Sequence, residues 1–143
     1  MDSLEAMQKV VCYIVRDDEL LVFKHLGQPW DESGLQVPAG TGKVGESPEA
    51  AAMREAREET GLDQLRLVRK LGVAEYDMRP YRDELQTRHV FRLEIDTETP
   101  DRWVARENDP GDGGRPIEFE CYWIPIAQGH VLSAGQGALL GRL

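Results

Sequence analysis

The segment from residue 40 to residue 62 constrains the fold of this chain most, because its local signals define one helix and both of its ends. Ser47 is a favoured helix N-cap, and Pro48 follows at the first helical position. An alanine-rich run then favours helix, and Gly61 stands where a left-handed residue can end it. The sequence therefore predicts a helix that begins at Pro48 and ends before Gly61.

The predicted helix carries three carboxylates, Glu55, Glu58 and Glu59, at the spacing i, i+3 and i+4. Residues with this spacing share one helix face, where like charges repel one another. A hard divalent cation such as Mg²⁺ takes oxygen ligands of this kind and would compensate the repulsion. The alternative is a solvated, acidic helix surface. The three glycines between residues 40 and 45 favour a binding site, because glycine permits close backbone approach.

The same residues match a known signature. The segment resembles the Nudix box, Gly-x5-Glu-x7-Arg-Glu-U-x-Glu-Glu-x-Gly-U, in which U is an aliphatic residue. The seven fixed positions are all filled, by Gly40, Glu46, Arg54, Glu55, Glu58, Glu59 and Gly61. Leu62 fits the last U position, and Ala56 fills the first with a smaller side chain than usual. Outside the box the likeness is one of layout.

Predicted strands precede and follow the helix along the chain. Their ranges are 8–16, 19–24, 35–37, 65–77, 87–95 and 117–124, with a short edge strand at 103–104. The first two form a hairpin, and Gly72 marks a bulge. The resemblance implies an α/β fold, the Nudix-type α/β/α sandwich with a curled mixed sheet, in a single domain over residues 1–143. In the segment 127–143, leucines favour a docking helix and four glycines disfavour one.

The resemblance also implies a metal-dependent reaction. The three helix glutamates would ligate Mg²⁺ or Mn²⁺, and the backbone carbonyl of Gly40 would be an additional ligand. Glu46 and Arg54 would orient the carboxylates, because a guanidinium can hold a carboxylate through two parallel hydrogen bonds. Divalent ions activate water and stabilise charge on phosphate oxygens. The expected activity is hydrolysis of a pyrophosphate bond in a nucleoside diphosphate linked to another group.

The general base is not fixed by the pattern. Within the box, Glu55 is the first candidate. Outside it, Glu118 and Glu120 share one face of the last predicted strand because side chains alternate along a strand. Glu94 and Glu98 are weaker candidates. The alternative for each residue outside the box is an ordinary solvent-facing carboxylate.

The sequence does not choose between the possible substrates. Dinucleoside polyphosphates, nucleotide sugars, nucleoside triphosphates and capped RNA ends all contain the expected linkage. Gln36, Tyr76, Arg79 and Tyr81 are candidates for substrate contacts, because they lie next to the box or in the polar loop after the strand 65–77. An aromatic ring there could stack on a nucleobase, although packing is the commoner role for one.

The amino-acid composition limits the kinds of binding partner that we expect. The net charge of −9 argues against long nucleic acid, which needs basic patches. No apolar run approaches the roughly 20 residues of a membrane span, and residues 1–7 lack the pattern of a secretory signal. We therefore expect a cytoplasmic protein with a small-molecule nucleotide substrate and no membrane partner. A homodimer is compatible with the resemblance. The two cysteines, Cys12 and Cys121, are expected to be buried free thiols.

A different class of function is a nucleotide-sensing or binding module that uses the same fold without catalysis. Such relatives commonly lose box carboxylates or carry an added DNA-binding region. This chain keeps every fixed residue of the box and has no room for a helix-turn-helix domain. The sequence therefore favours an enzyme.

Overall fold

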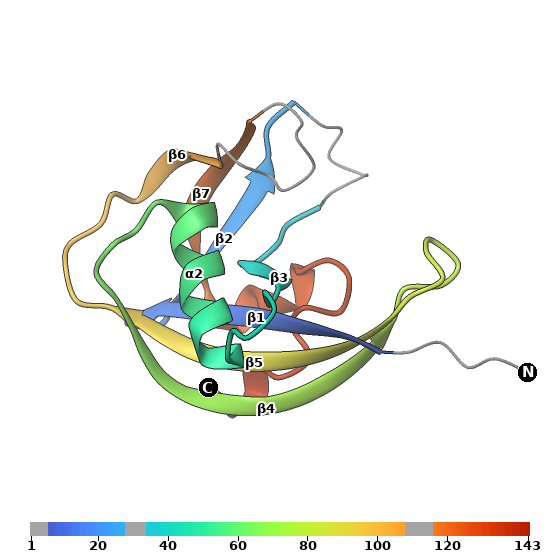
Figure 1. Ribbon diagram of the computed structural model, residues 1–143. Helices are drawn as coiled ribbons and strands as arrows, with labels where there is room; N and C mark the ends of the chain where they lie inside the picture. The colour runs from blue at the N-terminus through green and yellow to red at the C-terminus, as the bar shows by residue number, and fades with distance from the viewer. Residues whose placement is uncertain (1–5, 28–33, 108–115) are drawn as a thin grey trace, which may run out of the picture.

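A computed structural model describes residues 6–27, 34–107 and 116–143. In Figure 1 the main helix, α2 (Pro48–Thr60), lies against a strongly curved sheet. The strands of this sheet are β1 (Ala6–Arg16), β2 (Glu19–His25), β3 (Ala39–Thr41), β4 (Leu65–Asp77), β5 (Leu85–Ile95), β6 (Arg102–Glu107) and β7 (Ile117–Pro125). The predicted mixed α/β architecture is confirmed.

The sheet has seven strands in the order β4-β5-β1-β2-β7-β6, and β3 pairs with β1 off this path. β1 and β5 run parallel, whereas the other pairs are antiparallel. The predicted hairpin between the first two strands is present, with Val15 opposite Leu20. The predicted bulge is also present, because the β4–β5 register shifts between Lys70 and Gly72. β6 is an edge strand, as predicted, but it extends to Glu107.

Two hydrophobic clusters cover the two faces of the sheet. Val10, Cys12 and Ile14 of β1 point toward α2, while Val11 and Tyr13 point to the opposite face. β1 is therefore buried on both faces and reads as a continuous apolar run. Cys12 and Cys121 are buried free thiols, as predicted. Burial raises the pKa of both thiols, which keeps them protonated and unreactive.

Helix α2 forms where its local signals place it. The Ser47 side chain accepts a hydrogen bond from the Ala50 N–H, and Gly61 ends the helix with a φ of 75°. Its buried stripe includes Ala51, Ala52 and Ala56. These side chains are small, so the helix backbone approaches the sheet closely and its carboxylates come near β3.

The opposite face is covered by the C-terminal segment without an α-helix. This segment contains two 3₁₀ turns, η1 (Ile126–Val131) and η2 (Leu140–Arg142). The glycines therefore outweigh the leucines, and the docking helix considered from the sequence does not form. The segment still packs on the sheet, because Tyr13 Oη donates a 2.5 Å hydrogen bond to the Gln136 carbonyl oxygen.

We predict that Ala52→Leu destabilises the fold by about 1–3 kcal/mol, because added methylenes overpack the contact between α2 and the sheet. Ala52 is fully buried, and its carbonyl oxygen accepts a 3.3 Å hydrogen bond from the Cys12 thiol. Urea denaturation measures the free energy of unfolding. The matched control is Ala50→Leu on the exposed side of the same helix. Equal stability of the two variants would contradict the packing argument.

Candidate active site

Arg54 is the centre of a hydrogen-bonded network that joins the loop before α2 to the helix itself. It binds Glu46 through two parallel bonds, from Nε to Oε2 at 2.8 Å and from Nη2 to Oε1 at 2.9 Å. Its Nη1 donates to Glu55 Oε1 at 2.9 Å and to Glu58 Oε2 at 3.3 Å. Its Nη2 also donates to the Thr41 carbonyl oxygen at 3.0 Å. One guanidinium thus positions three carboxylates, as the resemblance implied for two of them.

Glu46 is held from two sides. Besides Arg54, the Lys43 N–H donates to its Oε1 at 2.9 Å. The hydrogen bonds from Arg54, followed by that from Lys43, lower the pKa of Glu46 to about 2. The same pairing raises the pKa of Arg54 above its usual range. The ion pair therefore stays charged at every ordinary pH.

Glu59 and Glu55 form a second, more buried element of the site. The Glu59 residue is 7% exposed, and burial is the largest cause of its raised pKa. A hydrogen bond with Glu55 and the charges of Glu55 and Glu107 raise this pKa further, while a hydrogen bond from the Ala39 N–H opposes them. A buried carboxylate that is hydrogen-bonded to a second carboxylate, with this surplus of negative charge, suits a bound cation.

Gly40 is placed against the Glu55 carboxyl group. A Cβ atom on Gly40 would lie 2.2 Å from Glu55 Cδ, so any larger residue would displace the Glu55 carboxyl group. Glycine here allows Glu55 to keep this position by close approach, and its φ is not in the left-handed region. The contact brings the β3 backbone next to the helix carboxylates.

The donor set fits a hard divalent cation in its chemistry, since it offers carboxylate oxygens and a nearby backbone. The side chains are not gathered into a finished cage: within the described ranges, no three or more His, Cys, Asp or Glu residues are grouped to hold a metal ion. Glu58 accounts for part of this, because it lies toward Arg54 and its side chain is 40% exposed.

Glu107 joins the site from β6, and sequence reasoning missed it. Its charge is one of the causes that raise the pKa of Glu59. Only residues 103–104 were predicted as strand, since the surrounding segment is rich in Asp, Glu, Pro and Gly. Alternation along a longer β6 would have placed Glu107 on the same face as Trp103, whose indole Nε1 donates to the Thr60 carbonyl oxygen of α2 at 2.8 Å.

Glu118 and Glu120 do share a face of β7, but it is the face opposite α2. Their neighbours Phe119 and Cys121 belong to the cluster that packs on the helix, so the glutamates point away from it. Glu120 pairs there with Arg102 and with Lys24. The structure therefore does not bring these two carboxylates to the site on α2.

The remaining outside candidates are not at the helix face either. Glu94 pairs with Arg66 at 3.0 Å and with Arg92 at 2.9 Å. Glu98 lies in the exposed turn between β5 and β6. Their proposed catalytic role has no contact in the structure that supports it.

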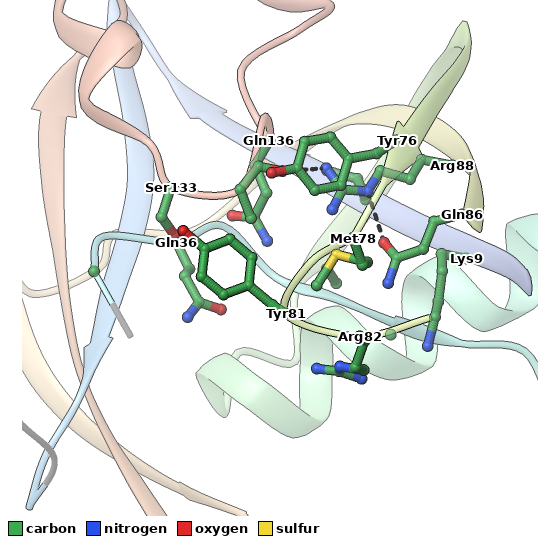
Figure 2. Close-up of a pocket in the computed structure, with 15 residues that line it drawn as sticks. Lys9, Gln36, Tyr76, Met78, Tyr81, Arg82, Gln86, Arg88, Ser133 and Gln136 are labelled. Atoms are coloured by element: carbon green, nitrogen blue, oxygen red, sulfur yellow. Dashed lines mark hydrogen bonds between the residues drawn. The ribbon is translucent and has the colours of Figure 1, made fainter. Parts of the chain in front are cut away.

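A cavity of about 640 Å³ lies beside the helix carboxylates, on the other side of β3. Three of the four predicted substrate contacts line it: Gln36, Tyr76 and Tyr81. Figure 2 shows Gln36 and Tyr81, the latter from the β4–β5 connection, among the residues that line the cavity. Arg79 is not among the lining residues, and its Nη2 donates to Asp77 Oδ2 at 2.7 Å. Arg82 lines the cavity in its place.

Comparison with known proteins agrees with this geometry. The model of the NUDIX domain family matches residues 6–138. The chain belongs to the Nudix family. RNA pyrophosphohydrolases of Brucella ovis and Brucella canis are 32% identical to it over 98 residues, which is 64% of this chain and 55% of each relative. The chain thus spans about half the length of the curated relatives it matches.

Solved Nudix structures share the fold. A UDP-X diphosphatase superposes with a TM-score of 0.68 at 19% identity, covering 99% of this chain and 63% of that one. A NUDIX hydrolase from Nitrosomonas europaea gives 0.66 at 22% identity, covering 96% and 86%. The C. elegans Ap4A hydrolase gives 0.63 at 18% identity, covering 96% of each chain. Within the described ranges, no helix is long and apolar enough to cross a membrane.

We predict that Glu46 contributes stability that is lost in acid. Its folded pKa is about 2 against an ordinary value of 4.5, so the contribution is complete above pH 4.5 and disappears as the pH falls toward 2. Urea denaturation of the wild type and Glu46→Gln between pH 6 and pH 2 measures this. The stability difference should shrink steadily toward pH 2, and a difference that is constant with pH would contradict the assignment.

Proposed function

We propose that this chain hydrolyses the pyrophosphate bond of a nucleoside diphosphate linked to another group. The observation that carries the proposal is the hydrogen-bonded pair of Glu55 and the buried Glu59, with Glu55 held against Gly40, in a segment that keeps every fixed residue of the Nudix box. The names of the relatives support it. RNA pyrophosphohydrolase, UDP-X diphosphatase and Ap4A hydrolase all denote enzymes that cleave phosphoric anhydrides.

The proposed cofactor is Mg²⁺ or Mn²⁺. Glu55, Glu58 and Glu59 would hold it with the backbone carbonyl of Gly40, since these groups supply the oxygen ligands that such ions prefer. When bound, the ion supplies a nucleophile at neutral pH and stabilises charge on phosphate oxygens.

The protein contributes positioning. Arg54 bonds to Glu55 and Glu58, and Glu46 fixes Arg54, so these carboxylates are restrained before any ligand arrives. We assign general-base action to Glu55, which would take a proton from the attacking water. Glu118 and Glu120 remain the alternative, although their face of the sheet gives this alternative no support.

Location and assembly complete the proposal. A cytoplasmic location is part of this proposal. Homodimer formation is a prediction that sedimentation analysis would test directly. A non-catalytic nucleotide sensor is the competing function, and a screen for hydrolysis of nucleotide substrates separates the two.

We predict that Glu59→Gln lowers kcat by about 100-fold or more, because loss of a metal ligand removes several kcal/mol of charge stabilisation. A panel of nucleoside triphosphates, nucleotide sugars and dinucleoside polyphosphates with Mg²⁺ or Mn²⁺ measures turnover, and electron paramagnetic resonance measures Mn²⁺ affinity. Glu49→Gln, an exposed change in the first turn of the same helix, is the control.

Two outcomes would contradict the proposal. Full activity and unchanged Mn²⁺ affinity in Glu59→Gln would remove this carboxylate from the metal site. A wild-type protein that binds nucleotides but hydrolyses none of the panel would be a sensor.

We predict that Glu118→Gln and Glu120→Gln each lower kcat by less than about tenfold, a barrier change of under about 1.4 kcal/mol. The reason is that both side chains lie on the sheet face away from α2. Turnover of the best substrate in the panel measures the effect. A larger loss in either variant, with unchanged stability, would return that glutamate to the list of general bases.

A further inference from the structure

The cavity beside β3 differs in charge from the rest of the chain. The protein carries a net charge of −9, yet three cationic side chains line the cavity, those of Lys9, Arg82 and Arg88. Among the described residues that line it there is no Asp or Glu. Glu84, which does not line the cavity, lies 3.7 Å from Arg82 Nη1, so Lys9 and Arg88 are the lining cations without an ion pair among the described residues. A concave surface on which one sign of charge predominates attracts ligands of the opposite sign.

Arg88 is the most constrained of these cations. It is only 6% exposed, and its guanidinium lies over the Tyr76 ring at 4.3 Å. Its Nε donates to Gln86 Oε1 at 2.9 Å, and its Nη1 donates to the Ala134 carbonyl oxygen at 2.6 Å. It forms no ion pair with any residue in the described ranges. A buried cation compensated only by neutral dipoles favours a ligand that brings negative charge.

Gln136 adds a fixed donor to the same wall. It is 8% exposed, and its Oε1 accepts a 2.8 Å hydrogen bond from the Val37 N–H. An N–H group can bond only to the oxygen of the amide, so this contact sets the orientation of the side chain. Its NH₂ group is then left as a donor. In Figure 2, Lys9 and Arg82 lie on the side of the view away from Ser133.

The cavity is bordered by β3, the strand that also contacts the carboxylates of α2. Ala39 and Gly40 line the cavity, while the Ala39 N–H bonds to Glu59 and Gly40 contacts Glu55. A ligand in the cavity would therefore be one β3 backbone away from the carboxylates. A chain of phosphates suits both the cavity and the carboxylate site. Its oxygens can accept hydrogen bonds from the cavity side chains, and they can also ligate a cation held by the carboxylates.

We propose that this cavity binds the phosphate chain of the substrate, so that the preferred substrates contain three or more consecutive phosphates. This inference rests on the function proposed above and selects among its substrates. Lys9, Arg82 and the Gln136 amide would contact phosphate oxygens directly. Arg88 is a positioning residue that holds Tyr76, Gln86 and the segment at Ala134 together, and its charge favours the anion.

The test is equilibrium binding, measured by calorimetry with Mg²⁺. The probes are a methylene-bridged nucleoside triphosphate, which resists hydrolysis, and the monophosphate of the same nucleoside. Gln136→Glu keeps the acceptor for Val37 but replaces the donor NH₂ by an anionic oxygen. We expect it to weaken triphosphate binding by about tenfold or more, the value of a hydrogen bond to a charged group, and to leave monophosphate binding nearly unchanged.

Two further variants keep the test decisive. Gln64→Glu adds the same charge at an exposed position in the α2–β4 connection and should leave both affinities unchanged. Lys9→Ala removes a cation without changing a buried residue, and it should also weaken the triphosphate selectively. If circular dichroism shows that Gln136→Glu does not fold, the Lys9→Ala variant alone decides the test.

Two results would overturn the proposal. Equal losses for triphosphate and monophosphate would assign the cavity to the nucleoside instead. Unchanged triphosphate affinity in both Gln136→Glu and Lys9→Ala would remove the cavity from substrate binding. A protein that shows the expected binding pattern but hydrolyses no nucleotide would contradict the proposed enzyme and leave the phosphate assignment intact.

Discussion

The ion pair between Arg54 and Glu46 is the interaction on which the site depends. It joins the loop before α2 to the helix, and the same guanidinium then reaches Glu55, Glu58 and the Thr41 carbonyl. Carboxylates on neighbouring turns would otherwise separate, because their charges repel. A planar guanidinium with several fixed donors can hold them in one arrangement, which the point charge of a lysine cannot do. The orientation of the helix face thus follows from one residue.

Small residues set a second constraint, the short distances from α2 to the sheet and from β3 to Glu55. Ala52 and Ala56 let the helix backbone lie close to the sheet, and Gly40 lets β3 lie close to Glu55. A larger side chain at any of these positions would separate the carboxylates from the β3 backbone. Ala56, at the first aliphatic position of the box, is fully buried between α2 and the sheet. Its unusually small side chain therefore fits this close contact. The ion pairs of Arg54 orient the carboxylates, and the small side chains bring Glu55 close to the β3 backbone.

The sequence predicted the parts of the fold that depend on local chemistry. Capping residues defined α2 to the residue, and alternation showed that Glu118 and Glu120 share a face. Alternation could not show whether this face lies toward α2 or away from it, because the orientation of β7 depends on its pairing with β2 and β6. Glu107 was missed for a similar reason, since its strand forms through pairing with β7 against a loop-like composition. The cavity had no local signal at all, because its walls come from segments that are distant in sequence.

β3 separates two neighbourhoods of opposite charge, and the proposed phosphate site depends on this arrangement in an otherwise acidic chain. On one side lie the carboxylates of α2, and on the other lie the cations of the cavity. At physiological ionic strength, exposed charges are screened beyond about 8 Å, so the net charge matters less to a ligand than the groups it touches. A phosphate group alone would be repelled by the acidic side, and a metal ion alone by the basic side. A metal–phosphate complex carries both signs in the right order, so the two sides of β3 are complementary to the complex as a unit.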